Sequence, residues 1–425
     1  MRIAQLHKIF LQNPMVCTDT RKITPNCIFF ALKGDNFNGN DYAEEALKKG
    51  ASYAILDEGK YPVSDTMILV DDVLETLQKL ATYHRNHCDA KIIALTGSNG
   101  KTTTKELINA VLSQKYKTIA TKGNLNNHIG VPLTLLSITK DTEIAIVEMG
   151  ANHLKEIEFL CTIVQPDFGY ITNFGKAHLE GFGGVEGVIK GKSELYDYLT
   201  DHNGQIFLNA DDPIQYEKLG SYIKKYGFTG HKKEFYTIEF LGAAPYVSLR
   251  VEGTTIQSQL IGSYNFTNCS AAVLMGKYFN VPIAAIKTAI ESYVPQNNRS
   301  QIIEKNGKQI ILDAYNANPS SMKVALENFS HLQGESKIAI LGDMFELGES
   351  SPIEHQHIAD LSASLDLDGA FLVGQNFYKT DTAFRKFKSY DELASNFKEI
   401  ALPRNCKLLI KGSRGMALER LLDLL

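Results

Sequence analysis

The chain has 425 residues, too many for a single hydrophobic core, so its length predicts two to four domains. Hydrophobic residues make up 44% and charged residues 22%, and the net charge of −4 without a long basic run argues against nucleic acid as the main partner. The six cysteines are scattered without a C-x-x-C pair, which favours a reduced cytoplasmic protein over a disulfide scaffold.

The first segment, 1–88, is expected to form a small α/β domain. Its opening residues, MRIAQLHKIFLQNP, are interrupted by polar side chains and lack a cleavage site, so they do not predict a signal peptide, and no apolar run in the chain reaches membrane-spanning length. NCIFFAL, YAIL and MILV are predicted buried strands. DYAEEALKKGA is predicted to be a helix ending at Gly50, and LETLQKLATYHRNH a helix leading into the next segment.

The second segment, 89–298, follows a strand–loop–helix pattern. KIIALTG, TEIAIVEMG, DFGYITN and QIFLNADD are apolar runs without alternation, and KTTTKELINAVLSQKY, NFTNCSAAVLMGKYF and PIAAIKTAIESY are predicted helices. Unalternated strands between helices predict a mostly parallel sheet covered on both faces. FYTIEF, YVSLRVEG and TTIQSQLIG alternate instead, so a small antiparallel patch is also expected.

The third segment, 299–425, restarts the α/β pattern. SQIIEKNGKQIILDAY predicts a hairpin around Asn306 and Gly307. KIAILG, GAFLVG and CKLLIKG are buried strands that each end in glycine, with helical spacers between them. This segment therefore predicts a second doubly wound, Rossmann-like sheet.

A glycine-rich loop joins the first strand of the second segment to the helix after it. The common phosphate-binding loop reads G-x-x-x-x-G-K-[ST], but here Leu95 stands where its first glycine would be. Backbone amides at a helix start can wrap a phosphate, Lys101 adds a positive charge, and Thr102 offers a hydroxyl to magnesium. A turn that only caps the helix is the alternative. The predicted nucleotide-binding loop comprises Gly97, Ser98, Asn99, Gly100, Lys101, Thr102 and Thr103.

Two further residues follow predicted strands of the same sheet. Glu148 ends an apolar run, and ligands of doubly wound sheets collect at the carboxyl ends of strands, so Glu148 is a candidate ligand of the magnesium ion that Thr102 contacts. A surface acid in a turn is the alternative. His178 lies just past another strand end, although a lone histidine is more often structural than a ligand.

Polar residues near the border between the second and third segments form another candidate group. Arg299 could clamp a phosphate when domains close or form an interdomain salt bridge, and its position favours neither. Asp313, Asn316 and Asn318 follow a strand, where an aspartate could hold ribose hydroxyls and the Asn-Pro pair could equally form only a turn. Asn268 could be structural.

Taken together, these motifs resemble the Mur ligase family over nearly the whole chain. The resemblance rests on DTRKITPNCIFFALKGDNFNGNDYAEEALKKGA in the first segment, on TGSNGKTTTKE, KGNLNNHIGVP, EMGAN and ITNFGKAHLEGFG in the second, and on DAYNANPSSM, LGDMFELGE and KGSRGM in the third. The spacing from Gly97 to Lys101 is that of this family and of its folate-ligase relatives. The resemblance implies a UDP-sugar domain (1–88), an ATP-binding domain (89–298) and a C-terminal ligase domain (299–425).

Within the family, the motifs most resemble the member that adds D-alanyl-D-alanine to UDP-N-acetylmuramoyl-tripeptide. This implies an ATP-dependent amide ligase that works through an acyl phosphate at the last cytoplasmic step of peptidoglycan precursor assembly. A monomer is expected. Another Mur ligase or a folylpolyglutamate synthase-like ligase is the alternative, followed by a P-loop kinase or ATPase.

The resemblance also implies roles for particular residues. Thr102, Glu148 and His178 would serve two magnesium ions, and Lys192, in preference to Lys190, would be carbamylated and ligate magnesium. The nucleotide would further contact Asn268, Arg299, Asp313 and Asn316. The UDP-sugar substrate would contact Thr20, Arg21, Lys33 and Gly34, and on its sugar–phosphate side Asn126 and Asn127. The segment 343–346 lies near the place expected for D-alanyl-D-alanine.

Overall fold

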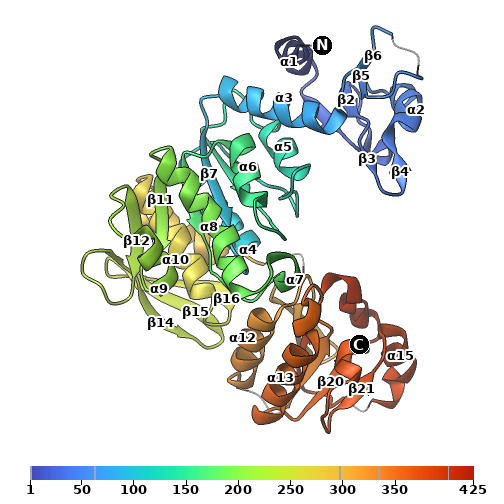
Figure 1. Ribbon diagram of the computed structural model, residues 1–425. Coiled ribbons are helices and arrows are strands. Elements are labelled where there is room, and N and C mark those ends of the chain that lie inside the picture. The colour runs from blue at the N-terminus through green and yellow to red at the C-terminus, as the bar shows by residue number, and fades with distance from the viewer. Residues whose placement is uncertain (1, 62–63, 296–297, 334–335, 401) are drawn as a thin grey trace.

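The computed structural model describes residues 2–61, 64–295, 298–333, 336–400 and 402–425. Three α/β regions follow one another along an elongated molecule, from the blue N-terminal region through the green and yellow central region to the red C-terminal region (Figure 1). This arrangement confirms the predicted three-domain α/β fold. None of the described helices is long and apolar enough to cross a membrane.

The N-terminal region is a parallel sheet with the strand order β1-β2-β5-β6. Its strands are β1 (Met15–Cys17), β2 (Cys27–Phe30), β5 (Tyr53–Leu56) and β6 (Met67–Leu69), beside a hairpin of β3 (Lys33–Gly34) and β4 (Phe37–Asn38) and the helices α1 (Ile3–Gln12), α2 (Ala43–Lys48) and α3 (Val73–His87). The predicted helix around α2 is shorter than expected, because the chain from Gly39 to Tyr42 winds as a 3₁₀ turn first. Gly50, with φ of +108°, ends the turn that follows.

The central region is built on a seven-stranded parallel sheet with the order β13-β12-β11-β10-β7-β9-β8. The strands are β7 (Lys91–Thr96), β8 (Thr118–Ala120), β9 (Ile144–Glu148), β10 (Phe168–Ile171), β11 (Gln205–Asn209), β12 (Lys225–Thr229) and β13 (Tyr236–Thr237). In β7, Ile92 and Ala94 are buried on one face, and Ile93 and Leu95 on the other. Both faces of the strand are therefore covered, as its unalternated sequence predicts.

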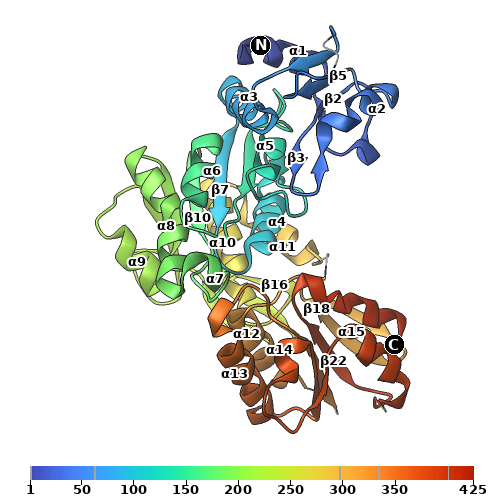
Figure 2. The same cartoon turned by 45° about the vertical axis from the view of Figure 1, so that its right-hand side comes forward.

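Helices cover the two faces of this sheet. One face carries α3, α5 (Gly130–Leu135), α6 (Glu156–Val164) and α8 (Val185–Asp201), and the other carries α4 (Lys101–Leu112), α10 (Asn265–Tyr278) and α11 (Ile283–Ser292). Short helices α7 (Leu179–Phe182) and α9 (Pro213–Leu219) complete the set. In Figure 2, α7 lies where the central and C-terminal regions meet.

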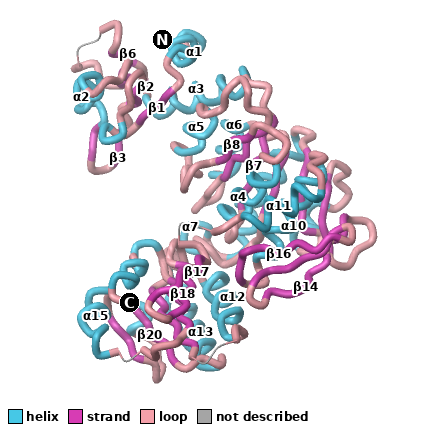
Figure 3. Tube along the Cα trace, turned by 180° about the vertical axis from the view of Figure 1, so that it is seen from behind, coloured by secondary structure: helices cyan, strands magenta, loops and turns pink. Residues whose placement is uncertain are grey.

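The predicted antiparallel patch is present, with one correction. It consists of β14 (Glu239–Ala243), β15 (Tyr246–Val251) and β16 (Thr254–Ile261), and α11 packs against β16 (Figure 3). The run FYTIEF is not one strand, because its Tyr236–Thr237 portion pairs with β12 at the edge of the parallel sheet. The chain changes sheets at the buried Ile238, whose amide still bonds to Thr229.

The C-terminal region has a six-stranded sheet with the order β17-β18-β22-β19-β20-β21. Its strands are β17 (Gln301–Lys305), β18 (Lys308–Asp313), β19 (Lys337–Gly342), β20 (Gly369–Val373), β21 (Arg385–Phe387) and β22 (Lys407–Lys411), and its helices are α12 (Pro319–Ser330), α13 (Ser351–Ser364), α14 (Gln375–Tyr378) and α15 (Tyr390–Asn396). The hairpin prediction is confirmed: β17 and β18 are antiparallel, and Asn306 and Gly307 both have positive φ. The other strands pair in parallel.

Candidate active site

A cavity of about 1090 Å³ lies between the carboxyl edge of the central sheet and the C-terminal region. β7 stands between β10 and β9, so the loops that leave these strands diverge at this point. Such a switch in strand order opens a crevice in which doubly wound sheets bind ligands. Residues after β7, β9, β10 and β18 all line the cavity.

The glycine-rich loop forms one wall of this cavity. Gly97 has φ of +140°, and a Cβ atom there would lie 2.0 Å from the Thr172 hydroxyl oxygen. Gly100 has φ of +78° at the N-cap of α4, and a Cβ there would lie 2.7 Å from Asn268 Oδ1. Both positions therefore require glycine. No side chain of the described residues caps α4, so its first amides are available to an anion.

Two cations meet at this wall. Lys101 Nζ donates to Gly97 O at 2.7 Å, and burial lowers the pKa of Lys101, with the nearby charge of Arg299 acting in the same direction and Glu148 opposing both. Arg299 Nε is buried and has no hydrogen-bond partner in the part of the chain that is described, while its guanidinium stacks 3.8 Å from the ring centre of Tyr315. A polyanion such as a nucleotide phosphate chain fits this excess of buried positive charge.

Glu148 and Thr102 bring oxygen atoms to the same wall. Glu148 is buried at the end of β9, and its Oε2 accepts from the Thr102 hydroxyl at 3.0 Å and its Oε1 from Asn126 Nδ2 at 2.8 Å. Hard oxygen donors of this kind suit Mg²⁺. The described residues contain no group of three His, Cys, Asp or Glu side chains that could hold a metal alone. A magnesium ion here would therefore keep waters and bind phosphate oxygens, as this ion prefers.

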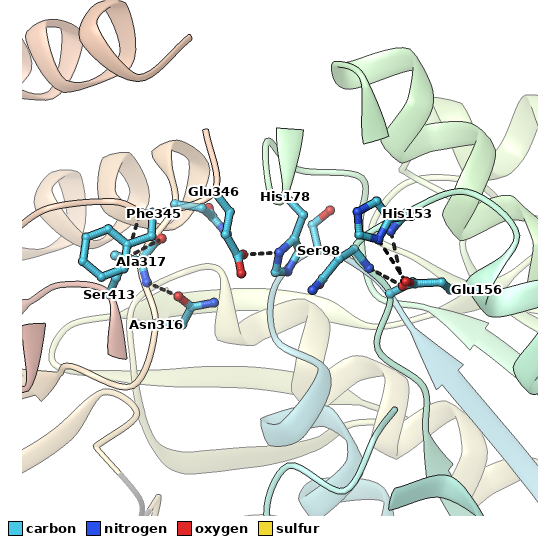
Figure 4. Close-up of polar contacts among 12 residues, drawn as sticks. Ser98, His153, Glu156, His178, Asn316, Ala317, Phe345, Glu346 and Ser413 are labelled. Carbon is cyan, nitrogen blue, oxygen red and sulfur yellow. Dashed lines mark hydrogen bonds and ion pairs between the residues drawn. The ribbon is translucent and has the colours of Figure 1, made fainter. Parts of the chain in front are cut away.

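His178 faces the cavity from the start of α7 but is bonded across the domain boundary. Its Nδ1 forms a hydrogen bond with a carboxylate oxygen of Glu346 in the C-terminal region, which lowers the pKa of Glu346 (Figure 4). Sequence reasoning did not assign Glu346 a role of its own. Because the Glu346 carboxylate occupies Nδ1, the other ring nitrogen of His178 is the one that could ligate a metal.

Lys192 lies one layer behind the cavity wall. Its side chain is fully buried in α8, and Nζ donates to the carbonyl of Ala151, a cavity-lining residue, at 2.8 Å. Burial lowers the pKa of Lys192 well below its usual value, so a larger share of the amine is neutral. Lys190 is exposed on the same helix. The structure thus separates the two lysines sharply, although neither lines the described cavity.

The remaining predicted nucleotide residues line the cavity from several elements. Asn268, buried in α10, accepts from the Thr104 hydroxyl at 3.0 Å and packs against Gly100. Asp313, at the end of β18, pairs with Lys411 at 2.5 Å, and Asn316 follows in the same loop. No motif in the sequence indicates the ion pair with Lys411.

Two asparagines of the site were overlooked as contacts of the glycine-rich loop. Asn173 Oδ1 accepts from the Asn99 amide at 3.0 Å, and Asn318 Nδ2 donates to Asn99 Oδ1 at 2.7 Å. Asn173 lies two residues after the end of β10, and Glu148 is the last residue of β9, so the same strand-end rule would have found Asn173. Asn318 also caps α12, so the Asn-Pro pair forms the start of a helix.

The predicted UDP-sugar residues are divided between two places. Asn126 and Asn127 line the cavity, whereas the described lining contains no residue of the N-terminal region. There, Arg21 is exposed and paired with Asp19 at 2.8 Å, and Lys33 pairs with Asp57 at 3.0 Å. Thr20 shares the short 3₁₀ turn of Arg21, and Gly34 shares the β3–β4 hairpin of Lys33.

Comparison with known proteins gives matches along the chain. Three models match: "Mur ligase family, catalytic domain" over residues 14–85, "Mur ligase middle domain" over 95–276, and "Mur ligase, glutamate ligase domain" over 298–412. The UDP-N-acetylmuramoyl-tripeptide--D-alanyl-D-alanine ligase of Bacillus subtilis is 33% identical to this chain, and the match covers 99% of this chain and 96% of the relative. The ligase of the same name from Escherichia coli is also 33% identical, and the match covers 95% of this chain and 92% of the relative.

Solved structures agree with these matches. MurF from Acinetobacter baumannii superposes with a TM-score of 0.84 at 32% identity, covering 96% of this chain and 92% of its own. MurF from Thermotoga maritima, solved in complex with ADP, superposes with a TM-score of 0.85 at 26% identity, covering 97% of each chain.

Proposed function

The chain belongs to the Mur ligase family, and from that premise we propose that it joins D-alanyl-D-alanine to UDP-N-acetylmuramoyl-tripeptide in peptidoglycan synthesis, with conversion of ATP to ADP and phosphate. The relatives that carry this activity in their names match it over almost their whole length. We further propose that 1–88 binds the UDP-sugar, 89–298 binds ATP and 299–425 completes the ligase site.

The observation that carries this proposal is the shared wall of Lys101, Arg299, Thr102 and Glu148. It combines the uncapped start of α4, the cations of Lys101 and Arg299, and the oxygen atoms of Thr102 and Glu148. These groups lie in one cavity that the central and C-terminal regions both line. Lys101 and the amides of 97–103 would hold the ATP phosphates, with Asn268, Arg299, Asp313 and Asn316 around the rest of the nucleotide. This arrangement suits phosphoryl transfer, in which positioning and charge stabilisation supply most of the catalysis.

The chemistry follows from the weakness of a carboxylate as an electrophile. The terminal carboxylate of the tripeptide attacks the γ-phosphorus of ATP, the bond to the bridging oxygen breaks, and an acyl phosphate and ADP result. The neutral amine of D-alanyl-D-alanine then attacks the acyl carbon, loses a proton, and expels phosphate to leave the amide. Lys101 stabilises the negative charge on the transferring group. Water would hydrolyse the acyl phosphate, so the walls that the central and C-terminal regions supply would have to exclude it.

The residues present fit magnesium, which when bound would offset charge on the transferring phosphoryl group. Thr102 and Glu148 would supply oxygen ligands and His178 its free ring nitrogen. Glu346 would orient His178, since ligating histidines usually donate their other N–H to a carboxylate. Lys192 fits carbamylation, because its lowered pKa favours the neutral amine that adds to carbon dioxide with loss of one proton, and the resulting oxygen anion could ligate magnesium.

The test is phosphate release from ATP with each substrate omitted in turn. We expect turnover only when UDP-N-acetylmuramoyl-tripeptide and D-alanyl-D-alanine are both present, with one amide formed per phosphate. Turnover without the dipeptide would instead support a kinase or simple ATPase. Turnover with a free amino acid in place of the dipeptide would support another ligase of the family.

A further inference from the structure

The first turn of α12 in the C-terminal region contacts two loops of the central region. Asn318, which is 7% exposed, donates from Nδ2 to Asn99 Oδ1 at 2.7 Å. The Ser320 hydroxyl accepts from the amide of Lys176 at 2.8 Å. A Cβ atom on Gly175 would lie 2.8 Å from Asn99 Nδ2 and 3.2 Å from Ser320 Oγ, so the three segments are in close contact.

The polarity of the Asn318–Asn99 bond is fixed by its surroundings. Asn318 Oδ1 accepts from the backbone amide of Ser321 at 2.9 Å, so Nδ2 must be the donor toward Asn99. The backbone of Asn99 is held by the central region alone. Its amide donates to Asn173 Oδ1, and its carbonyl accepts from the Thr172 hydroxyl at 2.7 Å and from Asn173 Nδ2 at 3.0 Å.

Asn99 therefore joins two functions in one residue. Its backbone belongs to the loop between Gly97 and Gly100, both of which have positive φ. Its side chain reaches the C-terminal region, where Asn99 Oδ1 accepts from Asn318 Nδ2. A shift of α12 away from the central sheet would break this bond and release the Asn99 side chain at the centre of the loop.

We propose that Asn318 is a positioning residue that couples docking of the C-terminal region to the shape of the nucleotide-binding loop. This inference rests on the proposed function, because it takes the 97–103 loop to hold the nucleotide phosphates. Coupling of this kind is reciprocal: nucleotide on the loop favours docking, and docking raises nucleotide affinity by the same factor. Asn318 itself need not touch the reacting atoms.

The variants must separate this role from the role of Asn318 as a helix cap. Asn318→Ser keeps an oxygen that can cap α12 but cannot reach Asn99, whereas Asn318→Ala removes both contacts. Asn99→Ala removes the acceptor and leaves the loop amides in place. Asn328→Ala is the matched control, since Asn328 also lies on α12 and bonds across the boundary to Ser263, at 3.0 Å, away from the loop.

The experiment is calorimetric titration of ADP with magnesium into the full chain and its variants, together with hydrogen exchange of the 97–103 segment. We expect Asn318→Ser and Asn99→Ala each to raise the Kd for ADP about fivefold, the effect of one hydrogen bond, and the double variant to be no weaker than either single one. Exchange in the loop should be faster in both single variants. In the Asn99→Ala, Asn328→Ala double variant, by contrast, the fold-change in the Kd for ADP should equal the product of the two single fold-changes.

Several results would overturn the coupling. Multiplied losses in the Asn99→Ala, Asn318→Ser pair would show that the two side chains act independently. Wild-type affinity in Asn318→Ser with a loss in Asn318→Ala would show that only the helix cap matters, and thermal unfolding would then follow the same order. Wild-type protein that binds no ADP would overturn the proposed function, and this inference with it, so the two failures are distinguishable.

Discussion

The carboxyl edges of the central and C-terminal sheets face the same cavity and use their acids differently. Glu148 ends β9 and directs its two oxygens to Thr102 and Asn126, both cavity residues. Asp343 directly follows β19, is equally buried, and accepts from the backbone amides of Asn376 and Phe377, both at 2.9 Å. A strand end thus carries an acid that lines the cavity in one sheet and an acid that bonds backbone amides in the other.

The helices that begin at the two sheet edges also differ in whether side chains bond their first amides. Among the described residues no side chain caps α4, whereas Asn318 caps α12 and Asp343 bonds the first amides of α14. Amides that a protein leaves unbonded at a helix start are the ones that bind anions. A strand-end position therefore indicates a site only when the neighbouring helix amides are not already bonded.

The largest effect expected from this comparison is that of Lys101→Met. It removes the buried charge beside the uncapped helix and should lower phosphate release about 10³-fold, as loss of transition-state charge stabilisation does. The fold should persist, since methionine fills a similar volume. Steady-state phosphate release measures this, with Lys190→Met, on the exposed face of α8, as a control of near wild-type activity. Normal turnover in Lys101→Met would show that Lys101, at the carboxyl edge of the central sheet, does not take part in catalysis.

The next largest effect is expected at Lys192, which lies behind the cavity wall at the central edge. Lys192→Ala should lower kcat about 10²-fold if a carbamate on Lys192 supports the metal ligands, and a short carboxylate such as acetate should restore part of the activity by occupying the space left. Lys190→Ala should do neither. Kinetics with and without acetate distinguish the two lysines, and a fully active Lys192→Ala variant would contradict carbamylation.

Asp343→Asn tests the C-terminal edge and should affect stability without affecting chemistry. An amide offers only one oxygen, so one of the two amides now bonded to Asp343 would lose its partner, at a cost of about 1–3 kcal/mol in the free energy of unfolding. Urea unfolding measures this change, and the activity of the folded fraction should stay near that of the wild type. Lost activity with unchanged stability would place Asp343 in the site after all.

The smallest expected effect is at the point where the two edges meet. The hydrogen bond from His178 lowers the pKa of Glu346 below its ordinary value of 4.5, so this carboxylate is charged at neutral pH and its contribution is lost only as the pH falls through the lowered pKa. Glu346→Gln should lower kcat/KM by about threefold at pH 7.5, since partly exposed pairs are worth little.

Salt provides the control for that last prediction. Because Glu346 is half exposed, screening should shrink the difference between wild type and Glu346→Gln as ionic strength rises from about 0.05 to 0.5 M. Parallel assays at about pH 7.5 and 8.5 should show the same difference, because both values lie well above the titration of Glu346. A difference that grows with salt would mean that the glutamine acts by changing the packing instead.

The parts of this site that the sequence could predict are those set by local rules. Gly97, Gly100 and Lys101 follow from a strand-to-helix junction, and Glu148 from its strand end. Asn318 as a contact of Asn99 could not be predicted, because 219 residues separate the pair and no local pattern encodes a contact between domains. The split of FYTIEF was missed for a different reason: the pairing of Tyr236 and Thr237 with β12 overrode the alternation that predicted one strand.

The position of β22 in the C-terminal sheet has a consequence for biosynthesis. This strand follows the other five of its sheet in the sequence, yet it lies between β18 and β19 and pairs with both. During translation, β17 to β21 are synthesised before β22. Until β22 is made, β18 and β19 each have one edge without its partner strand. Until residues 407–411 emerge, the growing polypeptide must avoid joining these edges wrongly, and a stop codon before them would leave the sheet in two halves.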